Sequence, residues 1–509
     1  MKLGLMSWCI LPLSVASFGA SSGDFRLEQA VQNKNTEVVL SLLEQHVDVN
    51  APGPDGATAL AWAVHWNDLA ITNLLIGAGA KVNTANDNGV TPLWLACYNG
   101  SAAMVERLLD AGADPNAAHL PAGETALLRC AGTGNVEAVR SLLSHGADVN
   151  AKEKAEQTAL MWALEERHPE VARVLIEHGA DVNAVSQGGF TPLLFAARQG
   201  DVDSGRLLLE KGAKPNVDSG RPAMPTVAFS DDPIGLQWFA RRSPETMSAL
   251  SVAINSGREQ FAIFLVEQGA NPNAADNRGM TALHYALQQG ISNLNGATHD
   301  PLSGALDFLF RPHMAELVNV LLDHGANPNV RILKRVSPLT IFFQDKPKIS
   351  LIGATPFLLA AATGDVKIMK LLLAKGADPL LTTDDGTTPL MAAAGISRSE
   401  DRTKEEEKNA LEALKLIVEL GGDVSATNKN GLTAMYGAAY TGANEIIRFL
   451  AGRGAKLDVK DKWGETPLSI AAGDPNGLAG DSTVVLRVRE STEALLRKLM
   501  ADHNMREWR

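Results

Sequence analysis

Residues 86–98 have the sequence NDNGVTPLWLACY, and this stretch decides the fold. Its first four residues are rich in Asn and Gly, which tolerate the left-handed backbone conformation of tight turns. Thr91 is a good helix N-cap. Pro92 suits the first helical position, because an N–H at that position would have no acceptor within the helix and proline lacks the N–H. Ala96 lets the helix pack closely on a neighbour. The stretch therefore predicts a tight turn followed at once by a short helix.

The hexad that begins at Thr91 recurs along the chain at a fixed spacing. The first five copies run from Thr58 to Thr191 and are 33 or 34 residues apart. Three gaps of 57, 74 and 45 residues are longer than the period, which indicates insertions. A period near 33 predicts a repeat architecture. Six later copies form pairs that are each 33 residues apart, at Ser248 and Thr281, Thr355 and Thr388, and Thr433 and Thr466.

Each period also contains a second predicted helix, as at residues 136–143, where Val and Leu recur at helical spacing. Gly146 is suited to end that helix, because glycine adopts the left-handed conformation found after helix C-termini. Residues 147–150, with the sequence ADVN, lead into an extended finger that precedes the next Thr.

These residues resemble the ankyrin repeat family. The shared pattern is D-x-x-G-x-T-P-L-x-x-A, a Leu-rich helix and then G-A-D-V-N, and it recurs some twelve times between residues 24 and 509. The resemblance implies an all-α solenoid of about 12 helix–turn–helix units with β-hairpin-like fingers. Stacked neighbours bury a continuous core that a single repeat cannot form. An aromatic content of only 5% is consistent with a core of Ala, Leu, Val and Ile.

The domain organisation follows from the repeats and from an unusual N-terminus. Residues 1–20 combine Lys2, an apolar stretch and a small-residue end, which predicts a secretory signal peptide cleaved after Gly19 or Ala20. An uncleaved anchor is the alternative. We expect the rest, 21–509, to be a single ankyrin-repeat domain. Its predicted parts are an N-terminal cap (21–57), regular repeats (58–217), repeats with long insertions (218–353), further repeats (354–464) and a C-terminal cap (465–509).

Charge and motif content narrow the classes of function. The formal net charge is −12 and no run of basic residues is present, which argues against a nucleic-acid partner. No P-loop, dinucleotide-binding, zinc-protease or serine-hydrolase motif occurs, so we expect no enzyme activity, no metal and no cofactor. We also expect no membrane association after signal cleavage, and a monomer.

Two cysteines, Cys97 and Cys130, remain after the predicted cleavage. They lie at nearly equivalent positions of adjacent repeats, which the resemblance places about 10 Å apart. A disulfide needs Cα atoms less than about 7 Å apart. We therefore predict two free, mostly buried thiols.

Candidate partner-binding residues come from two sources. The ankyrin resemblance implies that the end of each first helix and the residue before each Thr face outward, and exposed aromatic and Arg side chains there are typical binding hot spots. The insertions at 218–245 and 331–353 bring aromatic side chains into an otherwise aromatic-poor chain, although such residues can also pack back on the solenoid. The candidates are His65, Trp66, Tyr98, Phe190, Arg198, Phe229, Trp238, Phe239, Arg241, Phe342, Phe343 and Tyr440. Trp62, Trp94 and Trp162 lie inside hexads, and we expect them to be core.

The expected function is a non-enzymatic scaffold, exported to the periplasm or secreted, that binds a protein partner through fingers, concave helix faces and insertions. A more pointed alternative is an inhibitor or protective partner of one exported enzyme. An enzyme with a site in the insertions is a remote alternative, because no nucleophile–base pair or paired carboxylates are evident.

Overall fold

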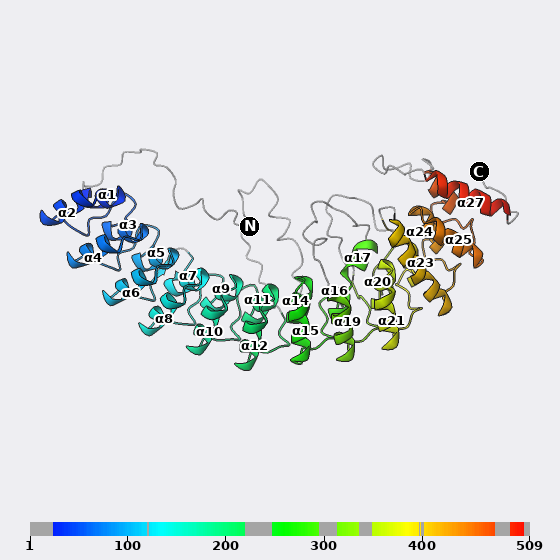
Figure 1. Cartoon of the computed structure of the whole chain (residues 1–509), viewed down its shortest axis with the longest axis horizontal. Coiled ribbons are helices and arrows are strands. Elements are labelled where there is room, and N and C mark those ends of the chain that lie inside the picture. The colour runs from blue at the N-terminus through cyan, green and yellow to red at the C-terminus, as the bar shows by residue number, and fades with distance from the viewer. Residues whose placement is uncertain are drawn as a thin grey trace. The chain divides into compact units, whose positions relative to one another are not determined.

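The computed structural model describes residues 24–119, 122–218, 247–294, 313–334, 349–396, 398, 402–473 and 489–502. Its contacts group the chain into two compact units, which we call unit 1, ending at Lys154, and unit 2, beginning at Ala155. Both units are built from helix pairs (Figure 1). The all-α ankyrin fold is thereby confirmed, whereas the single domain over 21–509 stays a prediction.

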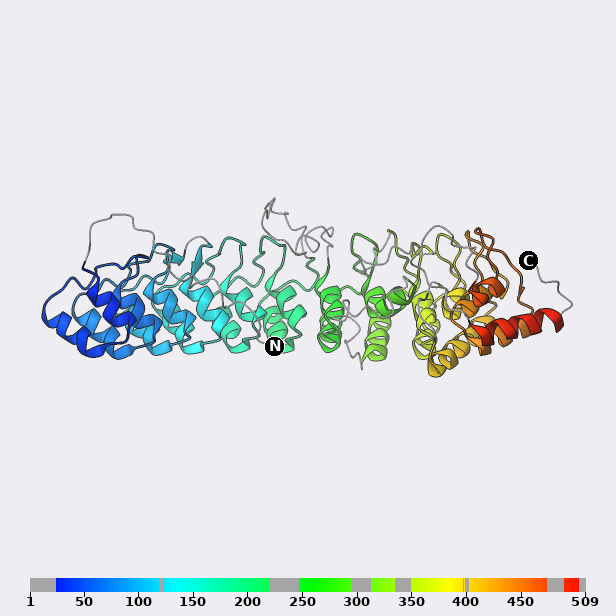
Figure 2. The ribbon, with the colours of Figure 1, turned by 90° about the horizontal axis from the view of Figure 1, so that it is seen from above.

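In unit 1, the first helix of each pair packs on the first helix of the next, in the order α1, α3, α5, α7. The second helices form a parallel layer, in which α6 packs on α8 (Figure 1). The loops between pairs extend to one side of these layers (Figure 2). The bounds are α1 Arg26–Gln32, α2 Thr36–Glu44, α3 Ala59–His65, α4 Leu69–Gly77, α5 Pro92–Tyr98, α6 Ala102–Asp110, β1 Ala118–His119, β2 Glu124–Thr125, α7 Ala126–Thr133 and α8 Val136–Ser144. Strands β1 and β2 pair antiparallel in one finger.

Unit 2 repeats the same two-layer arrangement. Its first helices have the bounds α9 Ala159–Glu165, α11 Pro192–Gln199, α14 Ala249–Asn255, α16 Ala282–Ala286, α20 Pro356–Thr363, α22 Pro389–Ala394, α24 Ala434–Tyr440 and α26 Pro467–Ala472. The second helices are α10 Pro169–Glu177, α12 Val202–Glu210, α15 Glu259–Glu267, α19 Met314–Asp323, α21 Val366–Ala374, α23 Lys404–Glu419, α25 Asn444–Gly452 and α27 Glu490–Asp502, and an added helix, α17 Gln288–Leu294, packs on α20.

Threonine caps begin most of the first helices, as the hexad predicts. The Thr91 hydroxyl accepts a hydrogen bond from the backbone N–H of Trp94 at 3.2 Å. The equivalent bond in α3 joins Thr58 to Ala61 at 3.4 Å. Each cap satisfies one of the backbone donors that the first helical turn leaves without a partner.

An asparagine ladder ties each unit's repeats together on the finger side. The Asn83 side chain donates to the Gly112 carbonyl at 3.0 Å and accepts from the Asp114 N–H at 2.7 Å. This Asn ends the sequence motif G-A-D-V-N, and the bridge it makes to the next repeat was not predicted from that motif. The same pair of bonds is made in unit 1 by Asn50 and Asn116, and in unit 2 by Asn183, Asn216, Asn273 and Asn329.

The described edges of the insertions pack against the repeats. Helix α17 lies so close to α20 that a side chain at Gly290 would meet the Leu359 carbonyl. Ile332, Ile349 and Leu351 are buried at the two ends of the 331–353 insertion. For these residues the alternative of packing back on the solenoid is therefore correct.

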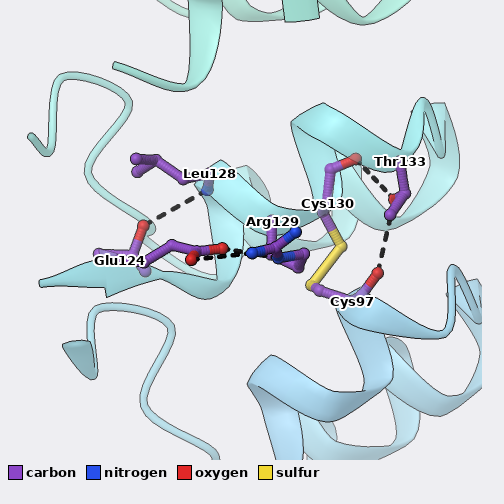
Figure 3. A network of polar contacts seen from close by, with 7 residues as sticks. Cys97, Glu124, Leu128, Arg129, Cys130 and Thr133 are labelled. Atoms are coloured by element: carbon purple, nitrogen blue, oxygen red, sulfur yellow. Dashed lines mark hydrogen bonds and ion pairs between the residues drawn. A yellow bond between two sulfur atoms is a disulfide. The ribbon is translucent and has the colours of Figure 1, made fainter. Parts of the chain in front are cut away.

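The prediction that Cys97 and Cys130 are free thiols is wrong. They form a buried disulfide between α5 and α7, with a Cα–Cα distance of 4.6 Å (Figure 3). Equivalent residues of neighbouring helices point the same way and are one helix spacing, about 10 Å, apart. Cys97 and Cys130 are one residue out of register with each other, so they lie on the facing sides of the two helices and meet.

Candidate partner-binding surface

The end of α3 carries a cluster of aromatic side chains. The Trp66 ring stacks on Trp62 with a centroid distance of 6.2 Å, and the His65 ring lies 4.7 Å from Trp66. Lys34, from the turn between α1 and α2, places its ammonium 3.9 Å from the Trp66 ring centroid. Trp66 nevertheless keeps 40% of its surface exposed. Trp62 is half-buried, so the prediction of a core residue holds only in part.

The end of α5 carries a second cluster next to the first. Trp94 is buried, as predicted, and stacks on Tyr98 and on His119 of β1 at 5.6 and 5.0 Å. Tyr98 is 46% exposed. The two clusters are joined because the Asn99 side chain donates to the carbonyl of His65 at 3.0 Å.

Arg129 of α7 extends this surface by one repeat. Its guanidinium lies 4.9 Å from the Trp94 ring and 5.9 Å from the Tyr98 ring. Its Nε lies 2.6 Å from the carboxylate of Glu124, which is buried, so this ion pair fixes the direction of the Arg129 side chain (Figure 3). The disulfide partner Cys130 is the next residue along the helix, and it holds α7 against α5.

We call Lys34, His65, Trp66, Tyr98 and Arg129 together the aromatic face of unit 1. The imidazole of His65 in this face and that of His119 beside Trp94 have lowered pKa values. Burial is the main cause for His65, and the nearby Lys34 charge adds to it. Burial also lowers the pKa of His119. The face therefore presents neutral rings and two cationic side chains at neutral pH.

In unit 2, Phe190 and Arg198 form a separate small cluster. The Arg198 guanidinium lies 5.7 Å from the Phe190 ring and forms an ion pair with Glu165. Tyr440 lies apart from them at the end of α24, with the Arg489 guanidinium 5.4 Å from its ring. All three predicted residues are half-buried.

Six predicted residues lie outside the described part of the chain, so their role stays a prediction. They are Phe229, Trp238, Phe239, Arg241, Phe342 and Phe343.

Sequence reasoning missed Lys34 and Arg129, although each carries a detectable signal. Lys34 lies at the turn between two helices, where most other repeats have glycine. Arg129 occupies the hexad position that holds Trp62, Trp162 or Phe195 in other repeats, so a charged residue there departs from the repeat pattern.

The described residues show neither a cluster of three metal-ligating side chains nor a helix apolar and long enough to cross a bilayer. The surface is suited to contact with a macromolecule, because its features are exposed ring edges and cations over a rigid, cross-linked base.

Comparison with known proteins identifies the family. The sequence profile for ankyrin repeats (3 copies) matches residues 27–119, 127–219, 234–298 and 405–479, and the single ankyrin repeat profile matches 352–384. These matches cover more than half of the chain, and the chain belongs to the ankyrin repeat family. Ankyrin repeats generally mediate protein–protein interaction.

Several curated proteins resemble part of the chain. Rabankyrin-5 of Mus musculus is 27% identical over 278 residues, covering 47% of this chain and 22% of that protein. Ankyrin repeat and SOCS box protein 16 of Mus musculus is 35% identical over 250 residues, covering 46% and 49%. The B-cell lymphoma 3 protein homolog of Mus musculus is 31% identical over 224 residues, covering 44% and 39%. The chain thus spans less than half the length of each of these relatives.

Proposed function

We propose that this protein is a non-enzymatic scaffold that binds a protein partner through the aromatic face of unit 1. The observation that carries the proposal is the exposure of Trp66 and Tyr98 on a rigid base. Trp, Tyr and Arg dominate binding energy at protein interfaces, especially where they are held in place before binding. Here stacking on Trp62 and Trp94 restrains the two rings.

We also propose that the protein is exported to the periplasm or secreted. Two observations support this. Residues 1–20 have the pattern of a secretory signal, and Cys97 forms a disulfide with Cys130. Disulfides persist in oxidising compartments and are rare in the cytosol. Cell fractionation followed by N-terminal sequencing tests the proposal, and recovery of the uncleaved protein with free thiols from the cytosol would refute it.

Partner capture from the native periplasm or medium tests the binding function. We expect the Trp66→Ala, Tyr98→Ala double variant to lose at least about ten-fold in partner affinity, because hot-spot truncations typically cost 2 kcal/mol or more. The matched control is Trp463→Ala, since Trp463 of unit 2 is also exposed, at 43%.

Equal capture by the double variant and by the natural protein would overturn the assignment of the face. If the captured partner is an enzyme whose activity the scaffold suppresses, the inhibitor alternative is supported. Turnover of a substrate by the isolated protein would contradict the non-enzymatic assignment.

A further inference from the structure

A small pocket opens beside the aromatic face, at the turn ends of the first two repeats. Its volume is about 100 Å³. An aliphatic cavity of about 150 Å³ accommodates benzene, so this pocket has room for a smaller, branched aliphatic group. The lining residues are Val31, Lys34, Asn35, Thr36, Val39, Ala63, Trp66, Asp68 and Ile71.

The pocket has an apolar floor and a charged rim. Val31, Val39 and Ala63 supply buried aliphatic groups. At the rim, the Asp68 carboxylate accepts a hydrogen bond from the Ile71 N–H at 2.9 Å, so it serves as the cap of α4. Lys34 rests on the Trp66 ring, and none of the carboxylates in the described ranges forms an ion pair with it.

The backbone at Lys34 is unfavourable for a residue with a side chain. Its φ is 55°, in the left-handed region; the corresponding turns of later repeats have Gly100 and Gly134, but also Asn67 and Arg167. Only glycine adopts this region without steric cost. Strained residues of this kind cluster at ligand-binding sites. The chain therefore keeps an ammonium at a position where glycine would stabilise the turn.

We propose that the pocket receives a leucine- or valine-sized side chain of the protein partner, and that Lys34 pairs with a carboxylate adjacent to it in the partner's sequence. The inference rests on the proposed binding function and adds the chemistry of the recognised segment, an aliphatic residue next to Asp or Glu. The aliphatic group fits the apolar floor, and the partner's carboxylate supplies the opposite charge with which the Lys34 ammonium forms an ion pair. Trp66 lines the pocket and also belongs to the aromatic face, so it links this contact to the rest of that face.

Three labelled peptides test the proposal by fluorescence anisotropy with the full chain. They are Gly-Gly-Leu-Glu-Gly-Gly and two matched peptides, one with Gln in place of Glu and one with Gly in place of Leu. We expect the Leu-Glu peptide to bind about three-fold more tightly than the Leu-Gln peptide, which is what an exposed charge pair supplies. Loss of the leucine is expected to weaken binding at least as much.

The Lys34→Gly variant separates recognition from folding. It removes the ammonium and relieves the turn, so its melting temperature is expected to be no lower than that of the natural protein. It should bind the Glu and Gln peptides equally and still prefer Leu over Gly. Asn67→Gly is the matched control, because Asn67 has a φ of 54° in the next repeat and does not line the pocket.

Two outcomes would overturn the inference: no preference for the Leu-Glu peptide, or a preference for Glu over Gln that survives in Lys34→Gly. If partner capture still depends on Trp66 and Tyr98 in that case, the proposed binding function stands and only the pocket's role falls. If capture does not depend on Trp66 and Tyr98 while the peptide preference holds, the pocket's role stands and the assignment of partner binding to the aromatic face falls.

Discussion

At the scale of single residues, His284 is a buried side chain that the fold keeps neutral. Its Nδ1 accepts from the Thr281 N–H at 3.1 Å, and its Nε2 donates to the Ala354 carbonyl at 3.3 Å. A proton on Nδ1 would face the Thr281 donor. Burial, the main cause, lowers the pKa of His284 to about 4. Protonation would therefore break the bond from the Thr281 N–H and place a buried charge between the repeats, whereas the neutral imidazole makes both bonds.

This pKa predicts loss of stability in mild acid. The unfolded chain takes up a proton near pH 6.5, whereas the folded state resists it down to about 4. The contribution of His284 to the free energy of unfolding is thus fully present above pH 6.5 and is lost as the pH falls toward 4. Between pH 7 and 5, the free energy of unfolding is expected to fall by about 2 kcal/mol. Denaturant unfolding at several pH values measures it.

His284→Gln is the matched variant, because its amide offers a donor and an acceptor but does not titrate. We expect it to be less stable than the natural protein at pH 7 but to lose about 2 kcal/mol less between pH 7 and 5. An unchanged pH dependence would mean that other groups cause the acid sensitivity.

At the scale of elements, the asparagine ladder makes the finger side of each unit continuous. It stops in unit 2 at Leu380, which occupies the position that Asn329 holds in the preceding repeat. Leu380 is 47% exposed, so it contributes little burial where an amide would make two hydrogen bonds. The ladder therefore has a natural gap.

The gap allows a reciprocal pair of substitutions. Asn116→Leu removes bonds to the Gly146 carbonyl and the Asp148 N–H. It is expected to lower the free energy of unfolding by about 1 to 2 kcal/mol. Leu380→Asn should raise it by up to about 1 kcal/mol, because Gly421 and Asp423 follow at the positions that Gly376 and Asp378 hold for Asn329. Thermal unfolding measures both, and destabilisation by Leu380→Asn would contradict the bridging role.

Elements with a repeated signal were predictable from the sequence, and contacts between non-equivalent positions were not. Each Thr hexad begins a helix because capping is a local property of a few residues. The disulfide and the Arg129–Glu124 pair depend on which sides of two helices face each other. When residues are compared only by their position in the repeat, residues of adjacent repeats are all expected to lie one helix-to-helix distance apart. This expectation made the distance between Cys97 and Cys130 too long for a disulfide. The exposed aromatics were found because their positions recur.

At the scale of the whole molecule, the division into two units has no counterpart in the repeat spacing. Thr125 and Thr158 are 33 residues apart, as elsewhere, although the boundary falls between Lys154 and Ala155. In a repeat protein, stability is a sum of local repeat and interface contributions, so a perturbation acts mainly on neighbouring repeats. The location of the disulfide within unit 1 therefore matters for what its reduction does.

Reduction of the disulfide is expected to destabilise unit 1 and leave unit 2 unchanged. The bond closes a sequence separation of 33 residues, which corresponds to about 3 to 4 kcal/mol of restriction in the unfolded chain. Hydrogen exchange should show lost protection in α5–α8 after reduction, with α20–α25 unaffected. The Cys97→Ala, Cys130→Ala variant controls for effects of the reductant, and it should give the same pattern without it. If protection falls equally in α20–α25, the chain unfolds as one cooperative structure, and the two units are not independent in stability.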